Sequence, residues 1–342
     1  MKNFLLILFL LSCGSLAAQT ETHSSSEPPS LVKWMTLKEA ETHYKEVPKP
    51  IIIDFYTEWC GWCKVMMKNT YSNPGIASYI NANYYPVKFD AETKDTVEFD
   101  GVKYAPTGKE KRDPNEFAVK MLNGKMVYPS TLFLNKAANF NMSAQGYLEP
   151  QKLEPMLVFV LENAFRSSTF DDFKNNFEKA FYDSTQQALY EKVKWKTPLE
   201  SFAENQKPSG KKRIVFIHTE WCNTCRVMYR TTFADSSLQT YLNRKFDLVD
   251  FNPENKDVLY FEGKSYQNQP TREMPFHQLV YTLDRKAFAL PQMVILDDND
   301  AILDVISFYI APDVFDDIIH FYGDDRYKNT KWEDFQKERK GK

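Results

Sequence analysis

The residues best suited to chemistry in this 342-residue chain are four cysteines, arranged as the pairs Cys60/Cys63 and Cys222/Cys225. The chain has one other cysteine, Cys13, close to its first residue. Two cysteines three residues apart lie about one turn apart when they sit on a helix, which is close enough to form a disulfide with each other. Each pair is therefore predicted to exchange electrons with a disulfide or dithiol of another molecule.

The position of each pair, directly after a predicted strand and at the start of a predicted helix, favours this chemistry. The thiolate is the attacking species, and a free thiol with a pKa of ~8.5 is only about 3% ionised at pH 7. Backbone N–H groups and the positive end of the dipole at a helix N-terminus stabilise a thiolate, and a pKa of ~7 would leave about half of the thiol ionised. Cys60 and Cys222 are predicted to be the nucleophiles, and Cys63 and Cys225 the resolving thiols.

Three other interpretations of the pairs remain open. Each pair could form a purely structural disulfide, or be a former catalytic site kept for binding, which fits the second pair better than the first. Zinc bound by four thiolates is disfavoured, because the pairs stand 159 residues apart (63 to 222) while ribbon-type sites usually have about 15–20 between pairs. We expect no metal and no dissociable cofactor.

The two pairs belong to an internal repeat. A shift of 162 positions, from Cys60 to Cys222, aligns the two halves without a gap from the first pair onward. Identical residues then recur along both halves, including Phe89 with Phe251, Gly101 with Gly263, and Pro129 with Pro291. A repeat of this length predicts two tandem domains. The predicted boundaries are domain 1 at 31–167, a connector helix at 168–192 with Phe at every third or fourth position, domain 2 at 193–330, and a charged C-terminal tail at 331–342.

Each half predicts the same series of elements. Capping-box patterns at 36–39 and 197–200 start a first helix, and Asn73-Pro74 and Asp235-Ser236 cap a later one. Strands and helices that alternate in this way favour an α/β domain with a central mixed β-sheet flanked by helices. The remaining expected elements are strands at 51–56, 85–89 and 131–134 with a closing helix near 150–165, and their counterparts at 214–218, 247–251, 292–296 and 312–322.

The first thirty residues and the overall charge bear on location and partners. Lys2, the apolar run 4–11 and the small residues that follow are typical of a signal peptide, predicted at 1–18, with a flexible leader at 19–30. A second processing route also fits, because Leu10-Leu11-Ser12-Cys13 looks like a lipobox that would leave Cys13 lipid-modified. The net charge of −3 provides no basic field for nucleic acid. We expect an exported protein of the periplasm or cell envelope. Simple cleavage of the signal peptide is slightly favoured over the lipobox route, under which a lipid anchor at Cys13 would be the one membrane contact.

The segment 54–64, Asp-Phe-Tyr-Thr-Glu-Trp-Cys-Gly-Trp-Cys-Lys, closely resembles the active-site segment of the thioredoxin family, and 216–226 repeats it. The resemblance covers about 32–166 and 193–329 and is closest to exported bacterial thioredoxin-like proteins and to the soluble domain of membrane-fed disulfide reductases. It implies two tandem thioredoxin-like domains.

The resemblance also implies roles for residues around the first pair. Asp54 stands where the family has a buried acid that relays a proton to the resolving cysteine, and Lys88 where it has the lysine paired with that acid. Trp59 lies beside the nucleophile, where an aromatic ring would shield the pair. Pro129 and Pro291 stand where a cis-proline faces the cysteines.

The second half departs from the family at its acid and its lysine, since Phe216 and Asp250 occupy those positions. His218 lies nearby and is interpreted as a hydrogen-bonded structural residue. Both halves also differ from the family in a long connection, 90–129 and 252–291, whose repeated Phe, Gly and Tyr positions predict an ordered element near the active site.

These observations predict a protein-disulfide oxidoreductase, with domain 1 the more competent site. Reduction or isomerisation is favoured over net oxidation, and a membrane or soluble redox partner would supply electrons. The alternative is a non-catalytic thioredoxin-fold scaffold, or a holdase for unfolded proteins.

Overall fold

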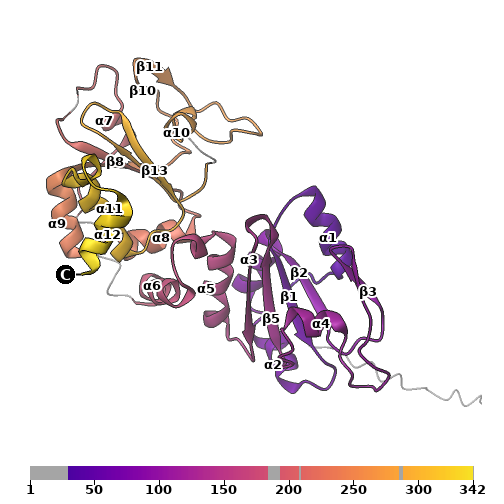
Figure 1. Cartoon of the computed structure of the whole chain (residues 1–342). Helices are drawn as coiled ribbons and strands as arrows, with labels where there is room; N and C mark the ends of the chain where they lie inside the picture. The colour runs from indigo at the N-terminus through magenta and orange to yellow at the C-terminus, as the bar shows by residue number, and fades with distance from the viewer. Residues whose placement is uncertain (1–29, 184–192, 208, 285–287, 342) are drawn as a thin grey trace, which may run out of the picture.

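The computed structural model describes residues 30–183, 193–207, 209–284 and 288–341, and they form two α/β units, each built on a mixed sheet (Figure 1). The predicted signal peptide, 1–18, and the leader apart from Ser30 lie outside these residues. Within the described ranges, no helix has the length and apolar character needed to cross a membrane.

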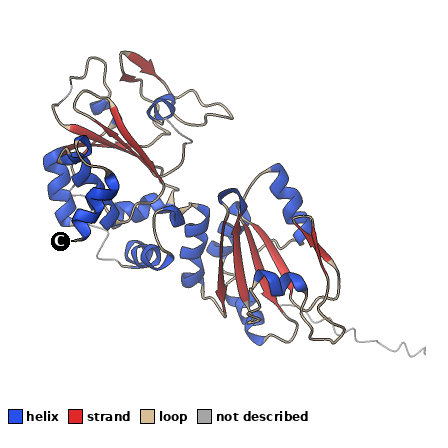
Figure 2. Ribbon diagram, viewed as in Figure 1, coloured by secondary structure: helices blue, strands red, loops and turns tan. Residues whose placement is uncertain are grey.

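The first unit has a four-stranded sheet in the order β2-β1-β5-β6, with β1 parallel to β2 and antiparallel to β5 (Figure 2). This is the predicted mixed sheet flanked by helices. Its elements are α1 (Leu37–Glu46), β1 (Ile51–Tyr56), α2 (Gly61–Asn69), α3 (Pro74–Asn83), β2 (Tyr85–Asp90), β3 (Val97–Phe99), β4 (Val102–Tyr104), α4 (Glu116–Met121), β5 (Ser130–Asn135), η1 (Lys136–Ala138), β6 (Phe140–Gln145), α5 (Pro150–Leu161) and η2 (Ala164–Arg166).

The second unit repeats this plan in a five-stranded sheet with the order β13-β12-β8-β9-β7. The short edge strand β7 is the addition, and it pairs parallel to β9. Its elements are β7 (Trp195–Lys196), α7 (Pro198–Ser201), β8 (Lys212–Ile217), α8 (Asn223–Arg230), α9 (Ser236–Lys245), β9 (Phe246–Phe251), β10 (Leu259–Phe261), β11 (Lys264–Tyr266), α10 (Gln278–Leu283), β12 (Gln292–Leu296), β13 (Ile302–Ser307), α11 (Pro312–Gly323) and η5 (Arg326–Lys328).

Local sequence signals place the helix starts. Thr36 and Thr197 each form a full capping box with the glutamate three residues on, at the start of α1 and α7. The side chains of Asn73 and Asp235 accept backbone N–H bonds at the first turn of α3 and α9. These predicted caps are confirmed.

The long connection between β2 and β5 is an ordered element that packs against the sheet and shares a hydrophobic cluster with β1 and β2. It contains the β3–β4 hairpin and α4, whose Phe117 is fully buried. The Phe117 ring contacts those of Phe89, Phe99 and Tyr104, at centroid distances of 4.9, 5.4 and 5.4 Å. In the second unit β10, β11 and α10 occupy the same place, so the repeated aromatic positions of the sequence mark a real structural insertion.

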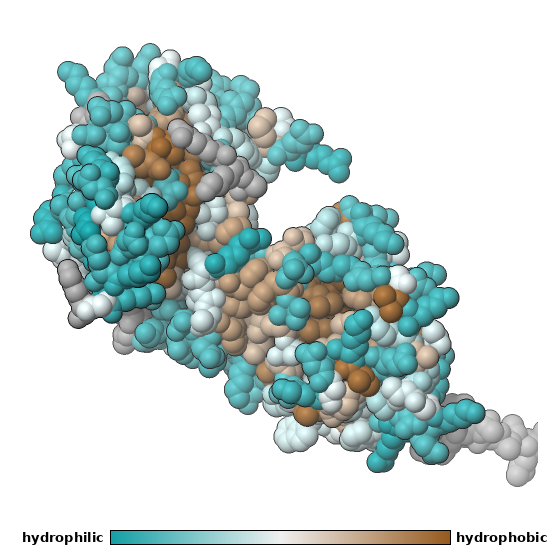
Figure 3. Space-filling model, viewed as in Figure 1, coloured by the Kyte–Doolittle hydropathy of each residue, from teal (hydrophilic) through white to brown (hydrophobic). Residues whose placement is uncertain are grey.

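The predicted connector and the predicted tail are the same element in two copies. Helix α6 (Phe170–Tyr182) follows η2, and helix α12 (Trp332–Lys340) follows η5, offset by the same 162 positions (170 to 332). The description of 331–342 as a charged tail is therefore wrong. Phe335 is buried and packs on Phe321, whose ring centroid lies 5.2 Å away. Trp332 also packs on Phe321, with 5.2 Å between ring centroids, while hydrophilic residues cover the outer side of the helix (Figure 3), which is why composition suggested a tail.

Helix α6 connects the cores of the two units. Phe173 and Phe177 are buried, and Phe173 contacts Phe159 of α5 on one side and Tyr309, which follows β13, on the other, at 5.4 and 5.2 Å between ring centroids. One hydrophobic cluster runs without a break from α3 and α5 through α6 into α8, β12 and α11. The two units are joined by shared buried surface as well as by the chain.

Truncating Phe173 to alanine is expected to destabilise the protein by about 3–5 kcal/mol, because the change leaves a cavity where both units meet. Guanidinium unfolding of the oxidised protein measures this. Asn175→Ala, on the exposed side of the same helix, should change stability by less than about 0.5 kcal/mol. Equal effects of the two variants would show that α6 carries little of the packing between the units.

Candidate dithiol active sites

The first cysteine pair forms a disulfide at the start of α2. Cys60 is the N-cap residue of that helix, and the S–S bond to Cys63 is 2.07 Å long. The backbone N–H of Cys63 donates to Cys60 Sγ at 3.0 Å, so an amide of the first helical turn points at the predicted nucleophile. The two cysteines are only 4% and 5% exposed, so a small area of sulfur reaches the surface.

Sheet topology brings Pro129 to the same edge as this disulfide. Strand β1 ends at Tyr56 just before the pair, and β5 runs antiparallel to it, with Ser130 opposite Phe55. Pro129 immediately precedes β5, so it lies at the edge where β1 ends. The Tyr128–Pro129 peptide bond is cis, and so is Leu290–Pro291 before β12 of the second unit. Both prolines have the conformation that the resemblance implied.

Asp54 is a buried carboxylic acid on β1, directly opposite Lys88 of β2 in the parallel register. Burial raises the pKa of Asp54 to about 7, although the Tyr71 hydroxyl and the charge of Lys88 act to lower it. Tyr71 Oη donates to Asp54 Oδ1 at 3.3 Å. The Lys88 ammonium lies 4.3 Å from the centroid of the Tyr56 ring. A carboxyl with a pKa near 7 is half ionised at neutral pH and is able both to accept and to return a proton.

Trp59 connects the first disulfide to the inserted element. Its Nε1–H donates to both carboxylate oxygens of Glu92 at 3.0 Å, and the Arg112 guanidinium lies 5.3 Å from its ring centroid. Tyr128, beside the cis-proline, meets the same indole edge-on at 6.1 Å between ring centroids. Trp59 is nevertheless 53% exposed, so part of its ring faces solvent.

Trp62, which lies between the two cysteines in the sequence, adds a second exposed indole to the site. It is 62% exposed and stacks on Tyr147, with 5.6 Å between ring centroids. Two exposed indoles, Trp59 and Trp62, are therefore next to the cysteines of the first disulfide in the sequence.

The second pair has the same backbone geometry. Cys222 is the N-cap residue of α8, and the N–H of Cys225 donates to Cys222 Sγ at 3.2 Å. The S–S bond is 2.04 Å, and Trp221 donates to Glu254 at 3.2 Å, as Trp59 does to Glu92. The two pairs form separate disulfides in separate units, so the structure does not bring four thiols together.

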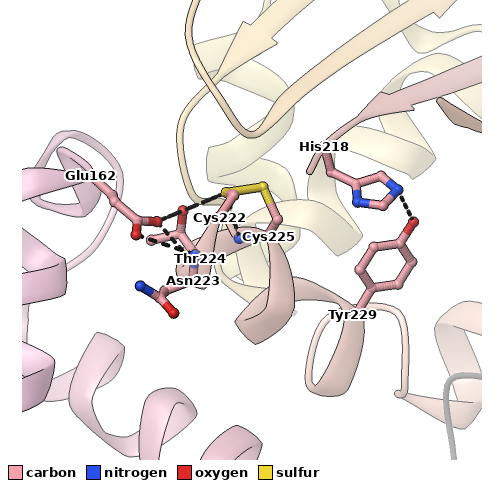
Figure 4. Close-up of a disulfide and its surroundings, with 7 residues drawn as sticks. All are labelled: Glu162, His218, Cys222, Asn223, Thr224, Cys225 and Tyr229. Carbon is pink, nitrogen blue, oxygen red and sulfur yellow. Dashed lines mark hydrogen bonds between the residues drawn. A yellow bond between two sulfur atoms is a disulfide. The ribbon is translucent and has the colours of Figure 1, made fainter. Parts of the chain in front are cut away.

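No acid occupies the Asp54 position in the second unit. The buried Phe216 stands there, opposite Asp250 of β9. His218 Nε2 bonds to the Asp250 carboxylate and lies 2.7 Å from Tyr229 Oη, on the side of the disulfide away from α5 (Figure 4). The repeat places Tyr56 and Lys88 at the positions of His218 and Asp250, so the two units carry opposite charge at the Lys88 and Asp250 positions.

Glu162, at the C-terminus of α5 in the first unit, is a site residue that sequence reasoning missed. Its carboxylate accepts the N–H of Asn223 at 3.2 Å and both the N–H and the hydroxyl of Thr224, at 2.7 and 2.6 Å. Its Oε2 atom also lies 3.9 Å from Cys222 Sγ (Figure 4). Burial raises the pKa of Glu162, while the hydrogen bonds from Thr224 and Asn223 act to lower it. One sequence signal existed: an acid at a helix C-terminus opposes the dipole of its own helix and therefore needs a partner elsewhere.

Comparison with known proteins identifies both halves. Residues 16–168 match the family model Thioredox_DsbH, described as a protein of unknown function, DUF255, and residues 199–323 match Thioredoxin_2, a thioredoxin-like domain. A search of curated proteins found no match.

Solved structures resemble the chain only distantly. A thioredoxin-fold protein from Helicobacter pylori is 17% identical over 46% of this chain and 94% of its own, with a TM-score of 0.31. A structure described as DsbH oxidoreductase is 17% identical over 38% of this chain and 86% of its own, with a TM-score of 0.25. The C-terminal domain of Neisseria meningitidis DsbD in its reduced form is 18% identical over 35% and 90%, with a TM-score of 0.24.

Proposed function

Because the chain is a tandem thioredoxin-like protein with a Cys-x-x-Cys pair in each domain, we propose that it reduces or isomerises disulfides of other proteins in the cell envelope. Domain 1 is the principal site. The observation that carries this proposal is the combination, in domain 1, of an amide pointing at Cys60 Sγ and the buried Asp54, whose pKa is about 7.

The reaction at domain 1 proceeds in two exchanges. The Cys60 thiolate attacks one sulfur of a client disulfide, a Cys60–client disulfide forms, and the other client sulfur leaves as a thiolate. The Asp54 carboxylate then takes the proton of Cys63, directly or through water, and the Cys63 thiolate attacks Cys60 Sγ. The client leaves with both sulfurs reduced, and the protein keeps the Cys60–Cys63 disulfide. A dithiol redox partner returns the two electrons by the same exchange in reverse.

The surface around the first disulfide supports a protein client. Trp59 and Trp62, each next to a cysteine of the pair in the sequence, expose two indoles, and cis-Pro129 leads into β5 at the edge of the sheet where β1 ends. Aromatic rings of this kind bind apolar segments of many sequences, as a disulfide reductase with several clients requires. We propose the cell envelope as the location because the first residues of the chain have the pattern of a signal peptide.

A mixed-disulfide trap tests this function. Cys63→Ser removes the thiol that releases the client, so Cys60 is expected to stay covalently attached to clients, visible as adducts on non-reducing gels that disappear with dithiothreitol. The matched control, Cys60→Ser/Cys63→Ser, should give no adduct through domain 1. Cys225→Ser is the equivalent trap for domain 2 and is expected to accumulate less.

Wild-type protein should also accelerate the reduction of insulin by dithiothreitol. If it does not, and Cys63→Ser traps nothing, the disulfide reductase is excluded. The non-catalytic scaffold or holdase then becomes the better description, with the exposed indoles as its binding surface.

A further inference from the structure

The two dithiol sites differ in whether another part of the chain covers them. At the start of α8, Glu162 of domain 1 accepts the amides of Asn223 and Thr224. The equivalent amides at the start of α2 belong to Gly61 and Trp62, and among the described residues no carboxylate bonds to them. Among the described residues, a carboxylate therefore accepts the first-turn amides of the second site and not those of the first.

Helix α6 also covers part of the second site, because it packs against the residues that follow β13. Tyr309 follows β13, next to the cis-proline strand, and is fully buried against Phe173 of α6. Its counterpart in domain 1, Tyr147, is only partly buried and stacks on the exposed Trp62. Arg166, beside α6, extends this cover, with its guanidinium 5.0 Å from the Phe308 ring centroid. The C-terminal part of domain 1 thus covers Phe308 and Tyr309 of domain 2. The equivalent surface of domain 1, at Tyr147, is open beside the first disulfide.

The electrostatic consequence falls on Cys222. The amides at the start of a helix stabilise a thiolate at its N-cap, and Glu162 takes two of them at α8, leaving the N–H of Cys225 as the one that points at the sulfur. In its ionised form, which the hydrogen bonds from Asn223 and Thr224 favour, the carboxylate also places a negative charge 3.9 Å from Cys222 Sγ. That charge disfavours a second negative charge on the sulfur. Both effects favour the thiol form of the reduced Cys222.

Other titratable groups around Glu162 change this balance little. Tyr79 lies in the middle of α3 and Tyr84 is its C-cap residue. Burial raises the pKa of both phenols, with the Glu162 charge adding to the effect, so both stay neutral. Glu154 on α5 adds a second negative charge, whereas Arg226 on α8, with Arg230 close to it, adds positive charge. Arg226 also lies over the Phe181 ring of α6, 4.7 Å from its centroid.

We propose that the docked first domain inhibits the second dithiol site: Glu162 keeps Cys222 in its thiol form, and Cys222 becomes an efficient nucleophile only when Glu162 leaves α8. This inference rests on the proposed thiol–disulfide exchange and adds its regulation. A partner that separates α5 and α6 from α8 would activate the second site.

The thiol pKa of Cys222 in the full chain tests the inference. In a background of Cys63→Ser and Cys225→Ser, each domain keeps only its nucleophile, and alkylation by iodoacetamide from pH 5 to 10 is followed for the Cys60 and Cys222 peptides by mass spectrometry. Cys222 is expected to titrate above the ~8.5 of a free thiol, and Cys60 below it. Glu162→Gln should lower the Cys222 pKa by about two units. Alkylation at pH 7 should then be faster by about tenfold, because the larger thiolate fraction outweighs its lower nucleophilicity.

Matched variants separate charge from structure. Glu154→Gln removes a charge from the same helix and should leave Cys222 unchanged, and Cys60 should be unchanged throughout. Glu162→Asp keeps the charge on a shorter side chain and should keep at least half of the raised pKa. If Glu162→Gln leaves the Cys222 pKa within about 0.3 units of the parent, or if Glu162→Asp lowers it as much as Glu162→Gln, the inference is wrong.

The proposed function fails on different evidence. An ordinary pKa for Cys60 and no insulin reduction by the wild type would exclude it, whatever Glu162 does to Cys222. Conversely, active reduction through Cys60 with no response of Cys222 to Glu162→Gln would exclude the regulation alone.

Discussion

Cys60→Ser is expected to remove about nine-tenths of the insulin reductase activity, whereas Cys222→Ser is expected to leave most of it. The serine hydroxyl is not ionised at neutral pH and does not attack a disulfide, so each variant silences one site. Cys60 lies at an uncovered helix start beside two exposed indoles, while Cys222 lies against the Glu162 carboxylate. Turbidity of insulin in the presence of dithiothreitol measures both variants.

The double variant Cys60→Ser/Cys222→Ser provides the baseline for this comparison. A loss in Cys222→Ser as large as that in Cys60→Ser would contradict the assignment of domain 1 as the principal site. It would mean that electrons pass through both disulfides in series.

Asp54→Asn is expected to make the protein more stable and less active at the same time. The pKa of Asp54 is raised from 3.8 to about 7 by folding, so between these values the folded protein holds a proton that the unfolded chain has lost. Stability therefore falls as pH rises from about 4 to 7, by about 1.4 kcal/mol per unit at most and roughly 3–4 kcal/mol in total. Asparagine does not titrate, so the variant should match the wild type near pH 4 and exceed it by about 3 kcal/mol at pH 8.

The activity of the same variant should change in the opposite direction. Without a base to take the proton of Cys63, the release step should slow by about 10²-fold at pH 8, and its rise through pH 7 should disappear. Guanidinium unfolding and single-turnover release of a trapped client, each from pH 4 to 9, measure the two effects. Asp95→Asn, an exposed acid of the same domain, is the control. A variant that gains no stability at pH 8 would show that Asp54 is not held with a raised pKa.

The sequence predicted what short-range patterns determine. Capping residues such as Thr36 and Asn73 give the helix starts, because their side chains bond to amides two or three residues away. The repeat placed both cysteine pairs at helix N-termini, and resemblance placed Pro129 and Pro291, whose peptide bonds are cis. Each of these features depends on residues close in the chain or on a pattern that occurs twice.

The features that the sequence did not reveal depend on contacts between distant segments. Glu162 meets Thr224 across 62 positions, and no local pattern records that distance. Helix α12 was misread as a tail because its charged exposed side dominates the composition, although Phe335 is buried. The equivalence of α6 and α12 was available in the spacing of Phe173 and Phe335, which also differ by 162 positions.

The hydrophobic cluster that α6 carries from one domain into the other limits how the halves can be used apart. A chain cut within 184–192 would leave Tyr309 without the Phe173 ring against it and would turn buried rings of both halves toward water. Each fragment would then expose an apolar surface and tend to associate with another molecule. The two domains should likewise unfold in a single thermal transition, because unfolding of either domain exposes buried apolar surface of the other. Although the repeat encodes two similar domains, this packing is expected to make them fold and unfold as one cooperative unit.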